Sequence, residues 1–232
     1  MRYQGGKDRL SKYIIPILED YRLSDQVYLE PFVGGGSVLS RMSGRRIASD
    51  IHYPLIAMYR ALQQGWNPPS AVSKGEYEDA QQQSHKYAAH ELAFIGYGCS
   101  WGGKWFGGYA AGEQRNYSNE SKQNLLSMDL SSVTLLCGPY WMYRPENMLI
   151  YCDPPYEDST KYKNAEQFDH LRFWLTMRWW AQDNVVFVSE RTIVPSYVAE
   201  LVWELSHTGG IRSNNEKPTE KLYRVKPLCV VI

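Results

Sequence analysis

Short apolar runs that alternate with longer amphipathic segments restrict the fold of this chain more than any other feature. We expect buried strands at residues 26–30 (QVYLE), 46–49 (RIAS), 134–137 (TLLC), 148–152 (MLIYC), 184–189 (NVVFVS) and 223–232. We expect helices at 53–64, near 168–180 and near 195–203, and a short helix that Ser37 caps. Strands that alternate with helices are typical of a mostly parallel sheet, so the predicted fold class is α/β.

Residues 54–128 do not show this strand pattern. A polar helical stretch at 76–97 is followed by a glycine-rich, aromatic segment at 98–118 (GCSWGGKWFGGYAAGEQRNYS), which is typical of a loop. We therefore expect residues 54–128 to be an inserted module, and residues 1–53 and 129–232 to form the main domain.

The charge balance argues against a histone-like, charge-driven binder, because 25 Lys and Arg face 25 Asp and Glu. Basic residues nevertheless gather locally. Residues 1–12 hold four basic residues against one acidic residue, and residues 207–226 hold five against two. Such patches leave nucleic-acid binding open, because local charge decides it.

The remaining composition predicts a soluble protein of a reducing cytoplasm. The sequence contains no apolar stretch near the roughly 20 residues that a membrane helix needs, and no signal-peptide core. Its four cysteines are scattered without a C-x-x-C pair, so we expect no metal site.

The segment LIYCDPPYEDS (149–159) ends an apolar run with an acid, two prolines and a tyrosine. Pro154 and Pro155 lack an N–H group and cannot continue a strand. Because both prolines fix φ, they would hold Asp153 and Tyr156 rigidly at the end of the sheet. A plain strand end followed by a turn is the alternative.

Two glycine segments have the composition of a cofactor site. EPFVGGGSV (30–38) is expected at a strand-to-helix turn, where glycines let a ligand approach the backbone. Asp50 follows Gly34 by sixteen residues, near the position where nucleotide-binding α/β folds place an acid for ribose hydroxyls; a helix cap is the alternative. YQGGK (3–7) suits a clamp for an anion or cofactor, or is a flexible terminus.

Together, YQGGK, EPFVGGGSV, SD (49–50) and CDPPY, in this order with a long insert before the last, resemble the Dam-like DNA adenine-N6 methyltransferases (D12 class, α group). The resemblance implies a seven-stranded Rossmann-like sheet, with residues 54–128 as the target-recognition region. It also implies S-adenosylmethionine as cofactor, S-adenosylhomocysteine as product and double-stranded DNA as substrate. The resemblance further implies a cytoplasmic protein that is bacterial, or phage-encoded and acting in the host cytoplasm. Neither a membrane nor an obligatory protein partner is expected.

The resemblance also implies roles for individual residues. The cofactor would contact Tyr3, Lys7, Phe32, Gly34, Gly36, Asp50, Tyr140 and Asp153. The catalytic group would be Asp153, Pro154, Pro155 and Tyr156: the Asp153 carboxylate and Pro154 carbonyl accept hydrogen bonds from the adenine amine, and Tyr156 stacks on the flipped base. DNA would contact Lys104, Trp105, Tyr109, Arg115, Ser213, Asn214 and Lys217.

Alternatives remain for these roles. The rings of the insert would equally form a local core, and the segment at 212–223 would equally be a solvated loop. Related D-P-P-Y motifs serve cytosine-N4, RNA adenine and protein glutamine-N5 transfer, although Asp153 as the first motif residue favours DNA adenine. A non-catalytic DNA-binding protein on the same fold is a further alternative. A dehydrogenase is disfavoured because G-x-G-x-x-G is absent.

Overall fold

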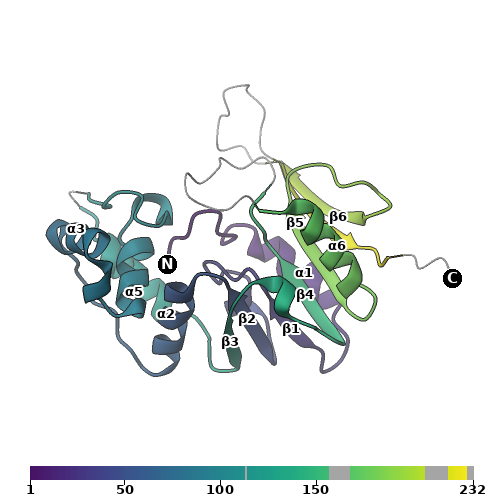
Figure 1. Cartoon of the computed structure of the whole chain (residues 1–232), viewed down its shortest axis with the longest axis horizontal. Helices are drawn as coiled ribbons and strands as arrows, with labels where there is room; N and C mark the ends of the chain where they lie inside the picture. The colour runs from purple at the N-terminus through teal and green to yellow at the C-terminus, as the bar shows by residue number, and fades with distance from the viewer. Residues whose placement is uncertain (113, 157–167, 207–218, 229–232) are drawn as a thin grey trace.

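The computed structural model describes residues 1–112, 114–156, 168–206 and 219–228, and a seven-stranded sheet forms its centre (Figure 1). In chain order the strands are β1 (Val27–Glu30), β2 (Arg46–Asp50), β3 (Val133–Cys137), β4 (Met148–Cys152), β5 (Val185–Glu190), β6 (Ala199–Ser206) and β7 (Thr219–Val225). Their order across the sheet is β3-β2-β1-β4-β5-β7-β6. Strands β1 to β5 run parallel, whereas β7 is antiparallel to both neighbours. The predicted α/β class and its seven-stranded sheet are confirmed.

The central strand β4 is buried on both sides, as its unbroken apolar sequence predicts. Leu149 and Tyr151 belong to a core shared with α1 (Ser11–Asp20). Ile150 and Cys152 belong to a second core, which is shared with α6 (His170–Trp180). The alternation of side chains along β4 therefore assigns one helix to each face of the sheet.

The insert is helical and lies beyond the β3 edge of the sheet (Figure 1). Its α-helices are α2 (Tyr53–Gln63), α3 (Lys74–Gln82), α4 (Ala89–Ala93) and α5 (Tyr117–Leu126). Helix α2 also packs on the sheet, where Arg60 donates to the Leu135 carbonyl at 2.8 Å and Gln63 donates to the Val133 carbonyl at 2.8 Å. Helix α2 therefore connects the segment between β2 and β3 to the sheet.

The N-terminal segment lies between the insert and the sheet. Gln4 N donates to the Gly103 carbonyl at 3.1 Å, and the rings of Tyr3 and Tyr97 are 4.9 Å apart. Lys7 N donates to Ser37 Oγ at 3.1 Å, which ties the same segment to the glycine turn after β1. These contacts join three parts of the chain that are distant in sequence.

One predicted helix is wrong. Residues near 195–203 were expected to be helical, but Ala199–Ser206 form edge strand β6, paired with β7. The helical spacing of Val198, Leu201 and Val202 produced the error. Pairing with a neighbouring strand overrides so weak a local preference. Only the turn before the strand is helix-like, with Val198 N donating to the Pro195 carbonyl at 2.8 Å.

Three further expectations need correction. The helix that Ser37 was to cap is a single 3₁₀ turn, Leu39–Arg41, because Ser37 Oγ accepts from Lys7 instead and Gly44 turns the chain at φ +68°. The last strand is Thr219–Val225 rather than 223–232, and residues 229–232 lie outside the described part. The polar stretch at 76–97 is broken into α3, a 3₁₀ turn (Ser84–Lys86), α4 and a π-turn (Phe94–Gly98).

Within the described residues, no helix is long and apolar enough to cross a membrane.

We predict that Gly103→Ala destabilises the fold much more than Gly102→Ala. Both glycines have left-handed φ values, +66° and +62°, so either substitution costs about 1 kcal/mol of backbone strain. A Cβ at Gly103 would also overlap the Arg2 carbonyl and lie 2.5 Å from Tyr3 N, whereas nothing lies within 4 Å of one at Gly102. Urea unfolding should show an additional loss of about 2 kcal/mol for Gly103→Ala. Equal losses would contradict this prediction.

Candidate active site

The candidate site lies at the carboxyl ends of β1, β2 and β4. Parallel neighbours end at the same edge of a sheet, so the glycine turn after β1, Asp50 at the end of β2 and Asp153 after β4 lie along one edge. Three segments, from the glycine turn to Asp153 far along the chain, are thereby brought together.

The glycine turn is held by hydrogen bonds to its backbone. Gly34 N donates to Asp50 Oδ2 at 3.1 Å, and Tyr59 of α2 donates its hydroxyl to the Gly34 carbonyl at 2.7 Å. Gly34 and Gly36 have φ values of +45° and +67°, which favour glycine. The ring of Tyr3 lies directly on Gly34, where a Cβ would come within 2.8 Å of it.

Asp50 faces the turn and the start of α2 at once. Its Oδ1 accepts from His52 N at 2.9 Å, while Oδ2 accepts from Gly34 N. Burial raises the pKa of Asp50, although these backbone donors oppose the shift. Asp50 therefore binds the backbone just before α2, as the helix-cap alternative expects, and it also binds the backbone of the glycine turn.

An aromatic cluster forms the wall beside the turn. Phe32 lies 5.2 Å from Tyr140, 6.0 Å from Phe168 and 5.7 Å from Phe173, measured between ring centroids. Tyr140 is buried, and burial raises the pKa of its hydroxyl to about 12. The two residues expected at the cofactor, Phe32 and Tyr140, are therefore in contact.

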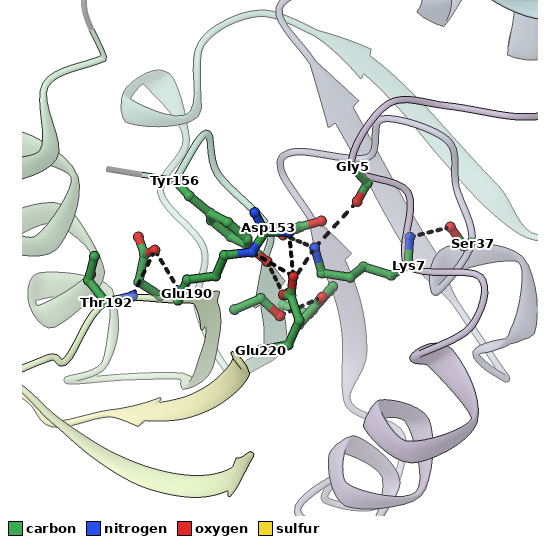
Figure 2. Close-up of polar contacts among 11 residues, drawn as sticks. Gly5, Lys7, Ser37, Asp153, Tyr156, Glu190, Thr192 and Glu220 are labelled. Atoms are coloured by element: carbon green, nitrogen blue, oxygen red, sulfur yellow. Dashed lines mark hydrogen bonds and ion pairs between the residues drawn. The ribbon is translucent and has the colours of Figure 1, made fainter. Parts of the chain in front are cut away.

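Asp153 is paired with Lys7 inside the site (Figure 2). The Lys7 ammonium lies 2.8 Å from Asp153 Oδ1 and 3.8 Å from Glu220 Oε2. Its side chain is 6% exposed, and that of Asp153 is 18% exposed. The ammonium therefore lies between two carboxylates with little access to water.

Glu220 is itself the centre of several contacts. Arg191 donates to Glu220 Oε1 from Nε at 2.8 Å and from Nη2 at 2.7 Å, and Tyr156 donates its hydroxyl to Oε2 at 2.7 Å. Lys7 Nζ lies 4.8 Å from the centroid of the Tyr156 ring, and the Arg191 guanidinium lies 4.9 Å from it. Two cations thus lie near this one ring, and its hydroxyl is bound to a carboxylate.

The two carboxylates respond differently to this surrounding. Burial raises the pKa of Asp153, and the nearby Lys7 only partly opposes the shift. Burial would also raise the pKa of Glu220, but Lys7, Tyr156 and Arg191 outweigh it, and the pKa is lowered. Glu220 is therefore the more firmly ionised of the two.

The DNA-contact residues predicted in the insert divide into two groups. The Trp105 ring packs 4.4 Å from His52 and 4.8 Å from Tyr97, and Tyr109 donates its hydroxyl to the Val72 carbonyl at 2.7 Å. These two rings pack in a local core, which is the alternative prediction for them from the sequence. Lys104 is exposed, and so is Arg115, which pairs with Glu120 at 2.9 Å. The predicted Ser213, Asn214 and Lys217 lie outside the described residues.

Three charged residues of the site were not predicted from the sequence. Glu30 is buried at the end of β1, where the Tyr28 hydroxyl donates to Oε2 at 2.8 Å. Glu220 and Arg191 come from β7 and the segment after β5. An acid at the end of a predicted strand was a usable signal for Glu30. The sequence contained no such signal for Glu220 and Arg191, because only the antiparallel pairing of β7 brings them here.

Comparison with known proteins finds a family model that matches the N-terminal part of this chain. The family model described as D12 class N6 adenine-specific DNA methyltransferase matches residues 3–94, which include the N-terminal segment, the glycine turn and Asp50. This segment of the chain is therefore similar to the D12 class. The D-P-P-Y motif lies beyond the matched residues, so its role rests on its position in the fold.

Two individual proteins are also similar to parts or all of this chain. The Type II methyltransferase M.CviBI of Paramecium bursaria Chlorella virus NC1A is 34% identical over 70 residues, which cover 28% of this chain and 25% of the viral protein. The chain thus spans about a quarter of the length of that relative. The crystal structure of SMU.472, a putative methyltransferase complexed with SAH, matches 99% of this chain and 55% of its own at 12% identity and a TM-score of 0.40.

We predict that Glu30→Gln removes a pH dependence of stability. Burial raises the pKa of Glu30 to about 8, from 4.5 when it is unperturbed. The stability that the neutral carboxyl contributes is full below pH 4.5 and is lost as the pH rises through 8. Relative to Glu30→Gln, the wild type should therefore lose a few kcal/mol of unfolding free energy between pH 5 and 8. Urea unfolding across this range, with exposed Glu200→Gln as control, measures it; parallel curves for wild type and Glu30→Gln would refute it.

Proposed function

We propose that this protein transfers a methyl group from S-adenosylmethionine to the exocyclic N6 amine of adenine in double-stranded DNA. The observation that carries the proposal is the position of Asp153: a buried carboxylate at the end of β4, beside the glycine turn and Asp50 of a D12-class segment. The site thus combines a hydrogen-bond acceptor for a nucleophile with a neighbouring place for a nucleotide cofactor.

The chemistry requires an acceptor of this kind. The lone pair of an adenine amine is delocalised into the ring, so the amine is a poor nucleophile until its hydrogens are held by acceptors. The Asp153 carboxylate and the Pro154 carbonyl would accept both hydrogens, and the two prolines would fix these acceptors before the base arrives. Because the pKa of Asp153 is raised, its carboxylate would also receive the proton that N6 loses.

The residues around the glycine turn fit S-adenosylmethionine. The Asp50 carboxylate would accept from ribose hydroxyls, and Phe32 and Tyr140 would contact the adenine ring. The left-handed φ values of Gly34 and Gly36 would give the turn its shape beside the cofactor. Tyr3 and Lys7 would border the methionine end. When bound, the cofactor supplies a methyl group on a positively charged sulfur and leaves as S-adenosylhomocysteine.

We assign DNA recognition to the insert, residues 54–128, and catalysis to the main domain, residues 1–53 and 129–232. Lys104 and Arg115 are exposed on the insert and would contact phosphates. The packed rings of Trp105 and Tyr109 would support this surface, with their exposed edges available to DNA. Ser213, Asn214 and Lys217 would contact DNA from the segment before β7. Tyr156 would stack on the flipped target base.

A transfer assay tests the proposed reaction. The protein is incubated with methyl-labelled S-adenosylmethionine and duplex DNA of random sequence, and the DNA is digested to nucleosides. Label in N6-methyldeoxyadenosine supports the proposal. Label in N4-methyldeoxycytidine, or in RNA or protein offered in parallel, would show that the substrate is cytosine, RNA or protein and not adenine in DNA. Cofactor binding without transfer to any of them would favour a non-catalytic DNA-binding protein.

We predict that Asp153→Ala abolishes methyl transfer, with a loss of at least about a hundredfold in kcat, because the amine loses its charged acceptor. Cofactor affinity should change by less than about threefold, since the Asp50 end of the site is intact. Single-turnover transfer and calorimetric titration with S-adenosylmethionine measure the two effects. Asp20→Ala, an exposed acid at the end of α1, is the control. Activity retained by Asp153→Ala would exclude this role.

We predict that Asp50→Ala weakens S-adenosylmethionine binding by about tenfold or more, because it removes the ribose acceptor and the partner of Gly34 N. Calorimetric titration measures the affinity, and thermal unfolding shows whether the start of α2 is preserved. If affinity is unchanged while stability falls, Asp50 serves only to hold the start of α2.

A further inference from the structure

We propose that Glu220 is a positioning residue for methyl transfer, which takes over the Lys7 ammonium when the target amine binds Asp153 and which holds Tyr156 in place. This inference rests on the proposed function. It concerns a residue outside the D-P-P-Y motif, contributed by the antiparallel strand β7.

The two carboxylates share one ammonium. Lys7 Nζ is 2.8 Å from Asp153 Oδ1 and 3.8 Å from Glu220 Oε2. It also donates weakly to the Gly5 carbonyl at 3.4 Å. An ammonium has three donors, so a small displacement would transfer the short contact from one carboxylate to the other.

In the proposed mechanism this transfer frees Asp153 for catalysis. While the Lys7 ammonium lies 2.8 Å from Oδ1, its positive charge weakens the hydrogen bond that this oxygen can accept from the adenine amine. Lys7 is almost fully buried, so an ammonium that leaves Asp153 cannot turn to bulk water and needs another anion. Glu220 lies within 4 Å and stays firmly ionised, as its lowered pKa indicates. The displacement leaves the net charge of the cluster unchanged.

Hydrogen bonds from Arg191 and Tyr156 hold the Glu220 carboxylate in one position, whereas Lys7 is free to move between the two carboxylates in the proposed mechanism. Arg191 holds Oε1 with two N–H groups. This leaves Oε2 to accept from Tyr156 and to face Lys7 (Figure 2). The two oxygens therefore have separate tasks. Because Tyr156 is anchored by the same oxygen, its ring would keep one orientation for stacking on the base.

The main test compares Glu220→Gln with Glu204→Gln. Glu204 lies exposed on β6 in the same hairpin, so the second variant makes the same chemical change away from the site. We expect Glu220→Gln to lower kcat for DNA methylation about tenfold or more, because Lys7 then stays on Asp153. The KM for DNA and the affinity for S-adenosylmethionine should change less than about threefold. Glu204→Gln should match the wild type.

The pH profile separates positioning from a general structural defect. The groups that influence the pKa of Asp153 come from several elements: Lys7 from the N-terminal segment, Glu220 from β7, Tyr156 from the same turn, and Glu30 and Tyr151 from β1 and β4. Among them, the negative Glu220 raises the pKa of Asp153. Removing it should shift the acid limb of kcat to lower pH, whereas a structural defect would lower kcat equally at every pH.

Glu220→Asp retains the charge and provides a second comparison if Glu220→Gln folds poorly. It should recover part of kcat and keep the acid limb of the wild type. The role is overturned if the wild type methylates DNA and Glu220→Gln has the kcat of Glu204→Gln, or if its loss is independent of pH. A wild type that binds cofactor but methylates nothing would instead refute the proposed function, and this role with it.

Discussion

The contact between the Lys7 ammonium and the Asp153 carboxylate is the interaction on which the arrangement of this site depends. Both groups have little access to water, and a buried charge is tolerated only where it is paired. Pairing requires the N-terminal segment to cross the carboxyl end of the sheet and reach β4. The same segment contacts Gly103 of the insert and Ser37 of the glycine turn. The ion pair and these hydrogen bonds thus join four segments that are distant in sequence.

This arrangement places the proposed recognition region in direct contact with the proposed catalytic one. The N-terminal segment that carries Lys7 also carries Tyr3, which packs against Tyr97 of the insert and against the glycine turn. A change in the insert on binding DNA would therefore reach Lys7 through only a few residues. In the proposed mechanism Lys7 must leave Asp153 when the base arrives, so this short connection suits a step that depends on DNA.

The elements that the sequence predicted correctly are those whose structure depends mainly on neighbouring residues in the chain. The strand Met148–Cys152 was predicted to the residue, because a strand covered on both faces shows as an unbroken apolar run that prolines terminate. The edge strand β6 was mistaken for a helix, because its exposed side admits polar residues and its pairing partner lies in β7. Helix α1 was not predicted, with Pro16 interrupting its pattern.

By itself, the sequence determined the α/β class and the end of β4 at Cys152, since each depends on the pattern and backbone constraints of adjacent residues. The spacing between Gly34 and Asp50 also identified Asp50 as a candidate site residue. Tertiary structure alone decided which charges surround Asp153. Glu220 and Arg191 reach the site because β7 inserts antiparallel between β5 and β6, and no local preference encodes that pairing. The same holds for the packing of Trp105 and Tyr109: burial is a property of the whole fold, not of a residue's neighbours in sequence.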